Sequence, residues 1–153
     1  MTPLDKGQLW VMRIRAGAFS LVFLLAGAGL EALLRDEIGL PRGVISLPLL
    51  LLAIWITFIA PARRFRAWGY AMDGEELQVQ HGLLTRIHTV VPLSRVEHLD
   101  IAQGPLERSF GVTRLIVHTA GTLHSQIQLP GLARATAETM RDEIRARIRQ
   151  EAA

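Results

Sequence analysis

The hydrophobic positions of this chain follow two different patterns, and the first occupies its N-terminal part. Two nearly unbroken apolar runs lie there, residues 16–34 with one charged residue and residues 44–60 with none. As helices they would be about 28 and about 25 Å long, close to the roughly 30 Å hydrocarbon core of a bilayer. The pattern predicts two transmembrane helices, joined by a short loop over residues 35–43 and preceded by a lead over residues 1–15.

Two other interpretations of the apolar runs are less favourable. A buried helix of a soluble protein can be apolar on all sides, but two such helices would need a large domain around them. A cleaved signal peptide would fit the basic residues before the first run and the small residues Ala26-Gly27-Ala28. The apolar run continues past that point to Leu34, however, and cleavage would still leave the second run as an anchor. We therefore favour two spans.

After Arg66 the pattern changes to two-residue alternation, which is typical of strands. Leu77 and Val79 alternate with glutamines in ELQVQHG, and TRIHTVVP, RVEHLDIAQ, VTRLIVH and LHSQIQLP have a similar character. About six short strands with no helix between them predict an antiparallel sheet, sandwich or barrel. Turn signals separate the strands: Asp73-Gly74, His81-Gly82, Gly104-Pro105 and Ala120-Gly121.

The last part of the chain returns to a helical period. Apolar residues follow four-three-four-four spacing and predict a helix over residues 133–149 with one apolar stripe. A row of arginines, Arg141, Arg145 and Arg149, lies on another face, which we interpret as solvated. We expect this helix to cover one face or end of the β region.

Charge separates the two parts of the chain. The formal net charge is +3. Residues 1–66 carry eight Lys and Arg against four Asp and Glu, whereas residues 67–153 carry nine Arg against ten Asp and Glu. The β region therefore lacks the basic surface that nucleic-acid binding needs, and we expect no nucleic-acid partner. The chain has no cysteine, which excludes disulfides, zinc–thiolate sites and cysteine nucleophiles.

The basic residues also orient the predicted spans. Lys and Arg gather on the cytoplasmic side of membrane proteins. Three basic residues precede the first run, whereas the two arginines of the loop 35–43 are balanced in charge by two acidic residues. We expect both termini in the cytoplasm, a short external loop, and a membrane junction after the second run made of Arg63, Arg64, Arg66 and Trp68.

The order of two spans, a basic and aromatic junction and a β-rich region resembles the membrane-anchored type of bacterial pleckstrin-homology (PH)-like domain proteins. The resemblance covers roughly residues 66–149 and implies a small barrel of about seven antiparallel strands closed by a C-terminal α-helix. Glu97 stands where the family pattern commonly has a Gln. The matching positions are Tyr70, Gly82-Leu83-Leu84, Val91-Pro92-Leu93, Arg95, Gln103-Gly104, Leu106, Arg108, Gly111 and Thr119-Ala120-Gly121.

The residues do not indicate catalysis. The five histidines lie on different predicted strands, and Ser94 and Ser109 have neither a glycine-flanked elbow nor an evident triad. His98 and Asp100 share one strand face and could form a metal pair, but we interpret them as a surface polar pair. No phosphate-binding loop occurs. We therefore expect no enzyme, no cofactor and no metal, in line with a resemblance that implies no shared catalytic chemistry.

Four arginines of the β region are the best candidates for contacts with an anion, such as a lipid phosphate, or with a partner, although a salt bridge or strand-end cap is favoured for each. They are Arg86, Arg95, Arg108 and Arg114. The chain is thus interpreted as a membrane-tethered PH-like module for protein–protein interaction or assembly, with another membrane protein or a second copy as partner. The alternative is a reader of anionic lipid headgroups, for which Arg108 would be tested first.

Overall fold

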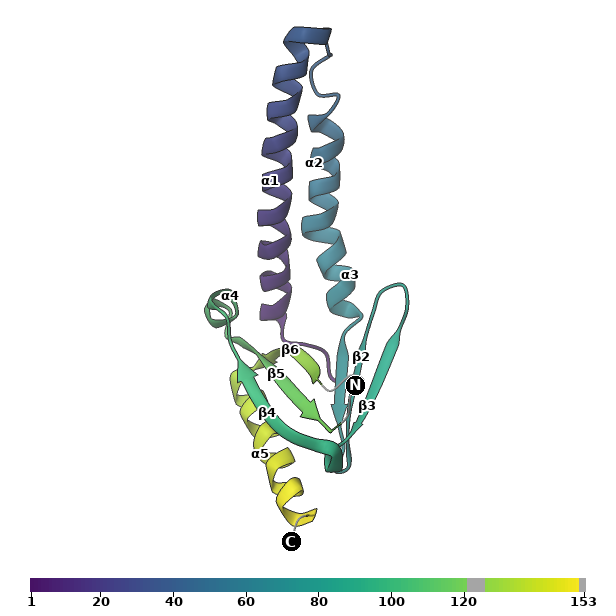
Figure 1. Ribbon diagram of the computed structural model, residues 1–153, viewed down its shortest axis with the longest axis vertical. Helices are drawn as coiled ribbons and strands as arrows, with labels where there is room; N and C mark the ends of the chain where they lie inside the picture. The colour runs from purple at the N-terminus through teal and green to yellow at the C-terminus, as the bar shows by residue number, and fades with distance from the viewer. Residues whose placement is uncertain (121–125, 152–153) are drawn as a thin grey trace. The chain divides into compact units, whose positions relative to one another are not determined.

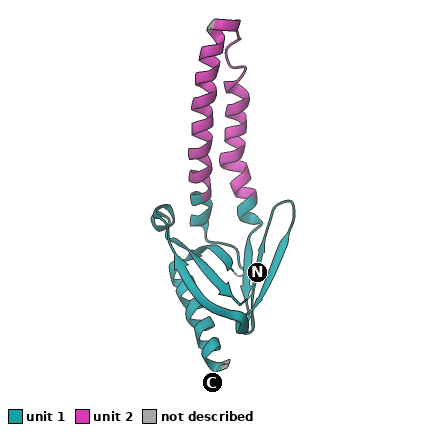
Figure 2. Cartoon of the chain, in the orientation of Figure 1, with its two compact units in different colours: residues 1–11, 64–153 teal, residues 12–63 magenta. Residues whose placement is uncertain are grey.

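The computed structural model describes residues 1–120 and 126–151 and divides into two compact units (Figures 1 and 2). The helical unit consists of residues 12–63. The β unit combines residues 1–11 with the residues from 64 onward. The β unit therefore contains both the first turns of the first long helix and the last residues of the second one.

The helical unit is built from two long apolar helices. The first is α1 (Lys6–Ile38); the second runs from Ser46 to Arg66 through α2 (Ser46–Ile54), the π-helical stretch η1 (Trp55–Ile59) and α3 (Ala60–Arg66). Both are long and apolar enough to cross a membrane. Leucines such as Leu25 and Leu33 are 66% and 72% exposed, unlike those of a soluble core helix. The structure thus contains two candidate spans, at Lys6–Arg35 and Ser46–Arg66.

Within the helical unit, the two helices and their loop are held by a few specific contacts. Gly27 allows close approach, because a β carbon there would overlap the side chain of Leu49. The carboxylate of Glu31 accepts hydrogen bonds from the backbone N–H groups of Gly43 (2.5 Å), Ile45 (3.2 Å) and Ser46 (2.8 Å). A residue of α1 thereby satisfies N–H groups at the start of α2 that have no partner within that helix.

The β unit contains two antiparallel three-stranded sheets. The first is formed in order by β1 (Gly69–Met72), β2 (Glu76–His81) and β3 (Ile87–Pro92), and the second by β4 (Val96–Ala102), β5 (Val112–Thr119) and β6 (Gln126–Ala133). The short helix η2 (Leu93–Arg95) links the two sheets, α4 (Pro105–Ser109) links β4 to β5, and α5 (Arg134–Glu151) follows β6. The antiparallel strands and the C-terminal helix are as predicted.

The closed barrel implied by the family resemblance is not formed. The two sheets stay separate, and the N-terminal strap, residues 2–5, is hydrogen-bonded to a strand of each. Thr2 exchanges two backbone hydrogen bonds with Tyr70 of β1, of 2.6 and 3.0 Å, and the N–H of Asp5 donates to the carbonyl of Gly131 in β6 at 2.8 Å. These edge groups of β1 and β6 are thus bonded to the strap.

The core of the β unit lies between the sheets and α5, which contacts all three strands of the second sheet (Figure 1). Leu77 and Val79 are buried, as their alternation with glutamines predicts. The strap contributes Leu4, which is also buried. Most of the other fully buried side chains come from the second sheet and from α5 and include Leu115, Val117, Leu129, Ala137 and Ile144.

Candidate functional site

The outer edge of β3 is open. Among residues 1–120 and 126–151, no further strand pairs with it, whereas the other edge strand of the same sheet, β1, is bridged by Thr2. Ile87, His88 and Val90 of β3 are exposed. An edge strand presents unpaired backbone N–H and C=O groups and is a template for pairing with another chain. Apolar side chains beside those groups make β3 a candidate docking edge.

The connection between β2 and β3 forms an apolar tip, residues 82–86. Leu84 is 99% exposed and Leu83 is also exposed, next to the exposed Arg86. Gly82 has a φ of +110°, and a β carbon there would overlap the carbonyl oxygen of Thr85, so this turn requires glycine. Two neighbouring exposed leucines on a short turn are more typical of a contact surface than of a solvated loop.

The strand register shows which end of the sheet carries the tip. Gly69 pairs with Gln80, and only two residues separate Gly69 from Arg66, the last residue of α3. Trp68 stacks on His81 with ring centroids 4.8 Å apart, which continues this alignment one residue further. The tip therefore projects from the end of the first sheet at which the chain arrives from α3.

The predicted membrane junction lies at this same end. Arg64 and Arg66 of α3 are exposed, and Arg63 is exposed at the end of the helical unit. Trp68 is half-buried against the core of the β unit. The role of these residues at a membrane surface remains a prediction.

The four candidate arginines do not form one cluster. Arg86 precedes β3 and Arg95 follows it, so they lie at opposite ends of a six-residue strand, about 20 Å apart. Arg108 is exposed on α4, in the connection between β4 and β5. Arg114 donates to Glu107 at 2.7 Å and to Gln128 at 3.3 Å. A role for any of them in binding an anion or a partner remains a prediction.

The family motif positions around α4 have structural roles. The side-chain amide of Gln103 donates to the carbonyl of Val112 at 3.0 Å, and the N–H of Gly104 donates to the carboxylate of Glu107 at 2.6 Å. Gly111 has a φ of +67°, which favours glycine. Glu107 was missed by sequence reasoning, although an acidic residue three positions after a helix cap is a recognisable signal. Of the remaining positions, Pro92 ends β3 and Gly121 lies outside the described residues.

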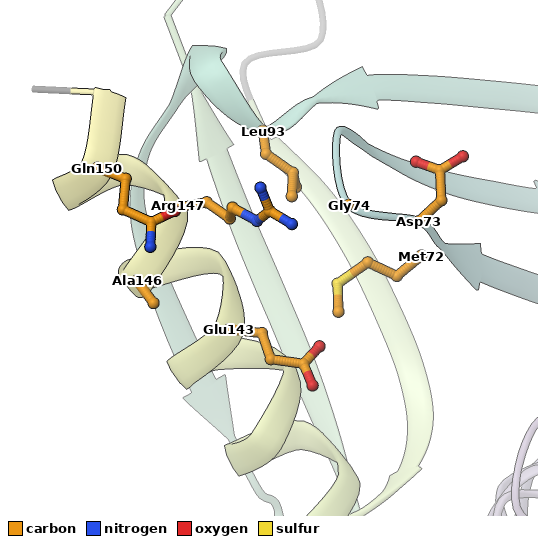
Figure 3. Close-up of a pocket in the computed structure, with 8 residues that line it drawn as sticks. All are labelled: Met72, Asp73, Gly74, Leu93, Glu143, Ala146, Arg147 and Gln150. Atoms are coloured by element: carbon orange, nitrogen blue, oxygen red, sulfur yellow. The ribbon is translucent and has the colours of Figure 1, made fainter.

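A pocket of about 410 Å³ lies between the β1–β2 turn, Leu93 and the end of α5 (Figure 3). Met72, Leu93 and Ala146 supply its apolar lining, and the guanidinium of Arg147 extends toward the turn. The carboxylates of Asp73 and Glu143 also line it, so the single cation is offset by two acids. This mixed charge does not favour a phosphate ligand.

The exposed face of the second sheet carries a polar cluster, His98, Asp100 and His118. The ligand atoms of these three side chains all lie within 4.8 Å of one another. His118 Nε2 is 3.1 Å from Asp100 Oδ2, and the rings of His98 and His118 are stacked with centroids 3.9 Å apart. Sequence reasoning paired His98 with Asp100 but missed His118, because only the strand register identifies it as the cross-strand partner of His98.

Comparison with known proteins agrees with the architecture. A family model described as Bacterial PH domain matches residues 17–148. The UPF0699 transmembrane protein YdbS of Bacillus subtilis (strain 168) is 34% identical over 102 residues, which cover 67% of this chain and 62% of that relative. The chain thus spans less than two thirds of the relative's length. No solved structure matches.

Proposed function

We propose that this chain, which belongs to the bacterial PH domain family, is a non-enzymatic interaction module that two transmembrane helices hold at the cytoplasmic face of a bacterial membrane. The observation that carries this proposal is the open edge of β3 with exposed Ile87 and Val90 beside it. An extended segment of another membrane protein would add to this edge, with main-chain hydrogen bonds giving affinity and the two apolar side chains giving selectivity.

The connection to the helices supports this proposal. The start of α1 and the end of α3 both belong to the β unit. If the helical unit crosses a bilayer as a hairpin, the β unit therefore stays next to the surface from which the hairpin inserts. Anchoring both partners in one membrane raises their effective concentration, so a short edge contact can suffice.

The docking edge is tested by site-specific photocrosslinking of the full-length protein in cells. A photoreactive residue is placed at Val90, and in a matched control at the exposed Arg145 on α5. We expect a discrete crosslinked product from position 90 that is absent from position 145. Ile87→Lys should weaken this crosslink, because a charge on an edge strand opposes strand addition.

The crosslinking results decide between the partners as well. A product with twice the mass of the chain identifies a second copy, and a different mass identifies another protein. Equal labelling from positions 90 and 145, or no labelling from position 90, would contradict docking at β3.

The apolar tip favours a second candidate function, contact with lipid headgroups. Leu83 and Leu84 can enter the interfacial region of a bilayer while Arg86 pairs with a lipid phosphate. The tip projects from the end of the sheet that α3 joins, which supports a position near the membrane surface. Among the predicted arginines, Arg86 is the one that lies in this tip, so it is the residue to test for this role.

The absence of cysteine allows a direct test of the tip. Leu84→Cys and, as a matched control, Ser94→Cys at the other end of β3 are labelled with an environment-sensitive fluorophore in full-length protein in nanodiscs. We expect a blue-shifted emission at position 84 but not at position 94. With anionic lipid the shift should increase, and Arg86→Ala should remove that increase. An aqueous spectrum at both positions would exclude the lipid function.

A further inference from the structure

We propose that His98, Asp100 and His118 form a binding site for a transition-metal dication on the exposed face of the second sheet. This site is separate from the β3 edge and the apolar tip, because its residues belong to β4 and β5. Among the described residues, these three side chains form a group whose ligand atoms approach one another closely enough to share an ion.

The strand register explains why the three side chains meet. His98 and His118 are directly opposite one another in the β4–β5 pair. Asp100 follows His98 by two residues and therefore points to the same face of the sheet. Asp100 pairs with Ile116, so it lies diagonally across from His118. At that spacing the long side chain of His118 can reach the Asp100 carboxylate. The backbone of two hydrogen-bonded strands thus preorganises three ligands from different parts of the chain.

The distances match a metal site that needs only small side-chain adjustments. Metal–nitrogen bonds of about 2.0–2.1 Å place neighbouring ligand atoms of a tetrahedral site about 3.3 Å apart. Asp100 Oδ2 and His118 Nε2 already lie 3.1 Å apart. The rings of His98 and His118 are inclined by only 14°, so their nitrogen lone pairs lie in nearly parallel planes 3.9 Å apart at the ring centroids, and one ring must turn to share an ion. His98 is exposed and has the space to do so.

The ligand set selects the class of metal. Two imidazoles and one carboxylate suit Zn²⁺, Co²⁺, Ni²⁺ or Cu²⁺, whereas Ca²⁺ and Mg²⁺ prefer oxygen ligands throughout. Three protein ligands leave at least one coordination position for water. Because the cluster lies on an exposed face, this position is accessible to a side chain of a docking partner. The site therefore resembles an exchangeable surface site more than a closed structural one.

The test uses full-length protein in detergent, without a histidine tag, titrated with Co²⁺ and then with competing Zn²⁺. We expect one equivalent of Co²⁺ to bind with visible d–d absorption, and Zn²⁺ to displace it. His118→Ala and Asp100→Asn should each weaken binding by about tenfold or more, since each removes one of three ligands. His88→Ala, which removes an exposed histidine of β3, is the matched control and should bind as the unchanged protein does.

A second measurement uses the unchanged protein, so its result does not depend on whether the variants fold. Zn²⁺ should protect His98 and His118, but not His88, from modification by diethyl pyrocarbonate, as read by mass spectrometry. Two results would overturn the proposal. One is the absence of Co²⁺ binding at millimolar concentration. The other is equal affinity in the unchanged protein and in correctly folded His118→Ala; a simple ion pair between Asp100 and His118 would then account for the cluster.

Discussion

The guanidinium of Arg114 in β5 donates a hydrogen bond to the buried carboxylate of Glu107 in α4 across 2.7 Å. The Glu107 side chain is only 4% exposed, whereas that of Arg114 is 29% exposed. The same carboxylate accepts the N–H of Gly104. One acidic side chain thus holds the start of α4 and joins α4 to the second sheet.

Replacing Arg114 is expected to destabilise the β unit. Arg114→Ala removes a cation that is hydrogen-bonded to a buried carboxylate, and we expect the free energy of unfolding to fall by about 2–3 kcal/mol, less than for a fully buried pair because Arg114 is partly solvated. Thermal unfolding of full-length protein in detergent measures the change. Arg108→Ala, at an exposed position of α4, is the control and should change stability by less than about 0.5 kcal/mol. Equal effects of the two substitutions would show that the ion pair contributes little.

The N-terminal strap should stabilise the β unit through Leu4. This side chain is buried in the core of the β unit, although it belongs to a segment that precedes α1. Leu4→Ala should lower the free energy of unfolding by about 2–3 kcal/mol through lost burial and a residual cavity. Amide hydrogen exchange should show faster exchange at the backbone of Tyr70, which pairs with Thr2. Unchanged exchange at Tyr70 would mean that the strap is not part of the folded unit.

Tyr70 should make stability depend on alkaline pH. Burial raises the pKa of the Tyr70 hydroxyl above its ordinary value of 10.0, because the charged phenolate is poorly solvated there. The folded state therefore holds this proton more tightly, and the contribution to stability is complete below about pH 10 and is lost as pH rises through the folded pKa. Tyr70 is the single tyrosine, so absorbance at the phenolate band should titrate at higher pH in folded than in unfolded protein. If the Tyr70 phenolate titrates at the same pH in folded and unfolded protein, burial does not raise the pKa of this side chain.

Glu31 should hold the loop of the helical hairpin in place. Glu31→Ala removes the acceptor for three backbone N–H groups, which then lose their charge-assisted hydrogen bonds, so the loop should open more often. Cleavage by trypsin after Arg42 proceeds through loop opening and should therefore become several-fold faster. Glu37→Ala changes an exposed acid of the same region and should not alter the rate. Equal cleavage rates would show that the Glu31 contacts do not restrain the loop.

Features with a local period could be predicted from the sequence. The two apolar runs gave two candidate spans, and the alternation around Leu77 and Val79 gave a strand with one buried face. The C-terminal helix followed from its apolar stripe. Each of these depends on the order of neighbouring residues, which is visible in the sequence itself.

Features that depend on pairing between distant segments could not be predicted in this way. The pairing of Thr2 with Tyr70 is one, and the register that places His118 opposite His98 is another. The prediction of a closed barrel was wrong for the same reason. No local pattern in the sequence showed that the strap would form hydrogen bonds with both β1 and β6. From the sequence, a salt bridge is favoured over an anion site for Arg114, and the structure contains one. Its partner, Glu107, could be identified only from the folded structure.

The N-terminal strap also constrains the order in which the chain assembles. Residues 2–5 leave the ribosome before both candidate spans, yet Asp5 bonds to Gly131 of β6, which is synthesised after them. The helical hairpin must therefore be made, and its ends brought back together, before the β unit can complete its pairing. If the two candidate spans insert into a bilayer, a hairpin that places its two ends on opposite sides cannot close the strap, so completion of the β unit would depend on correct insertion of both spans.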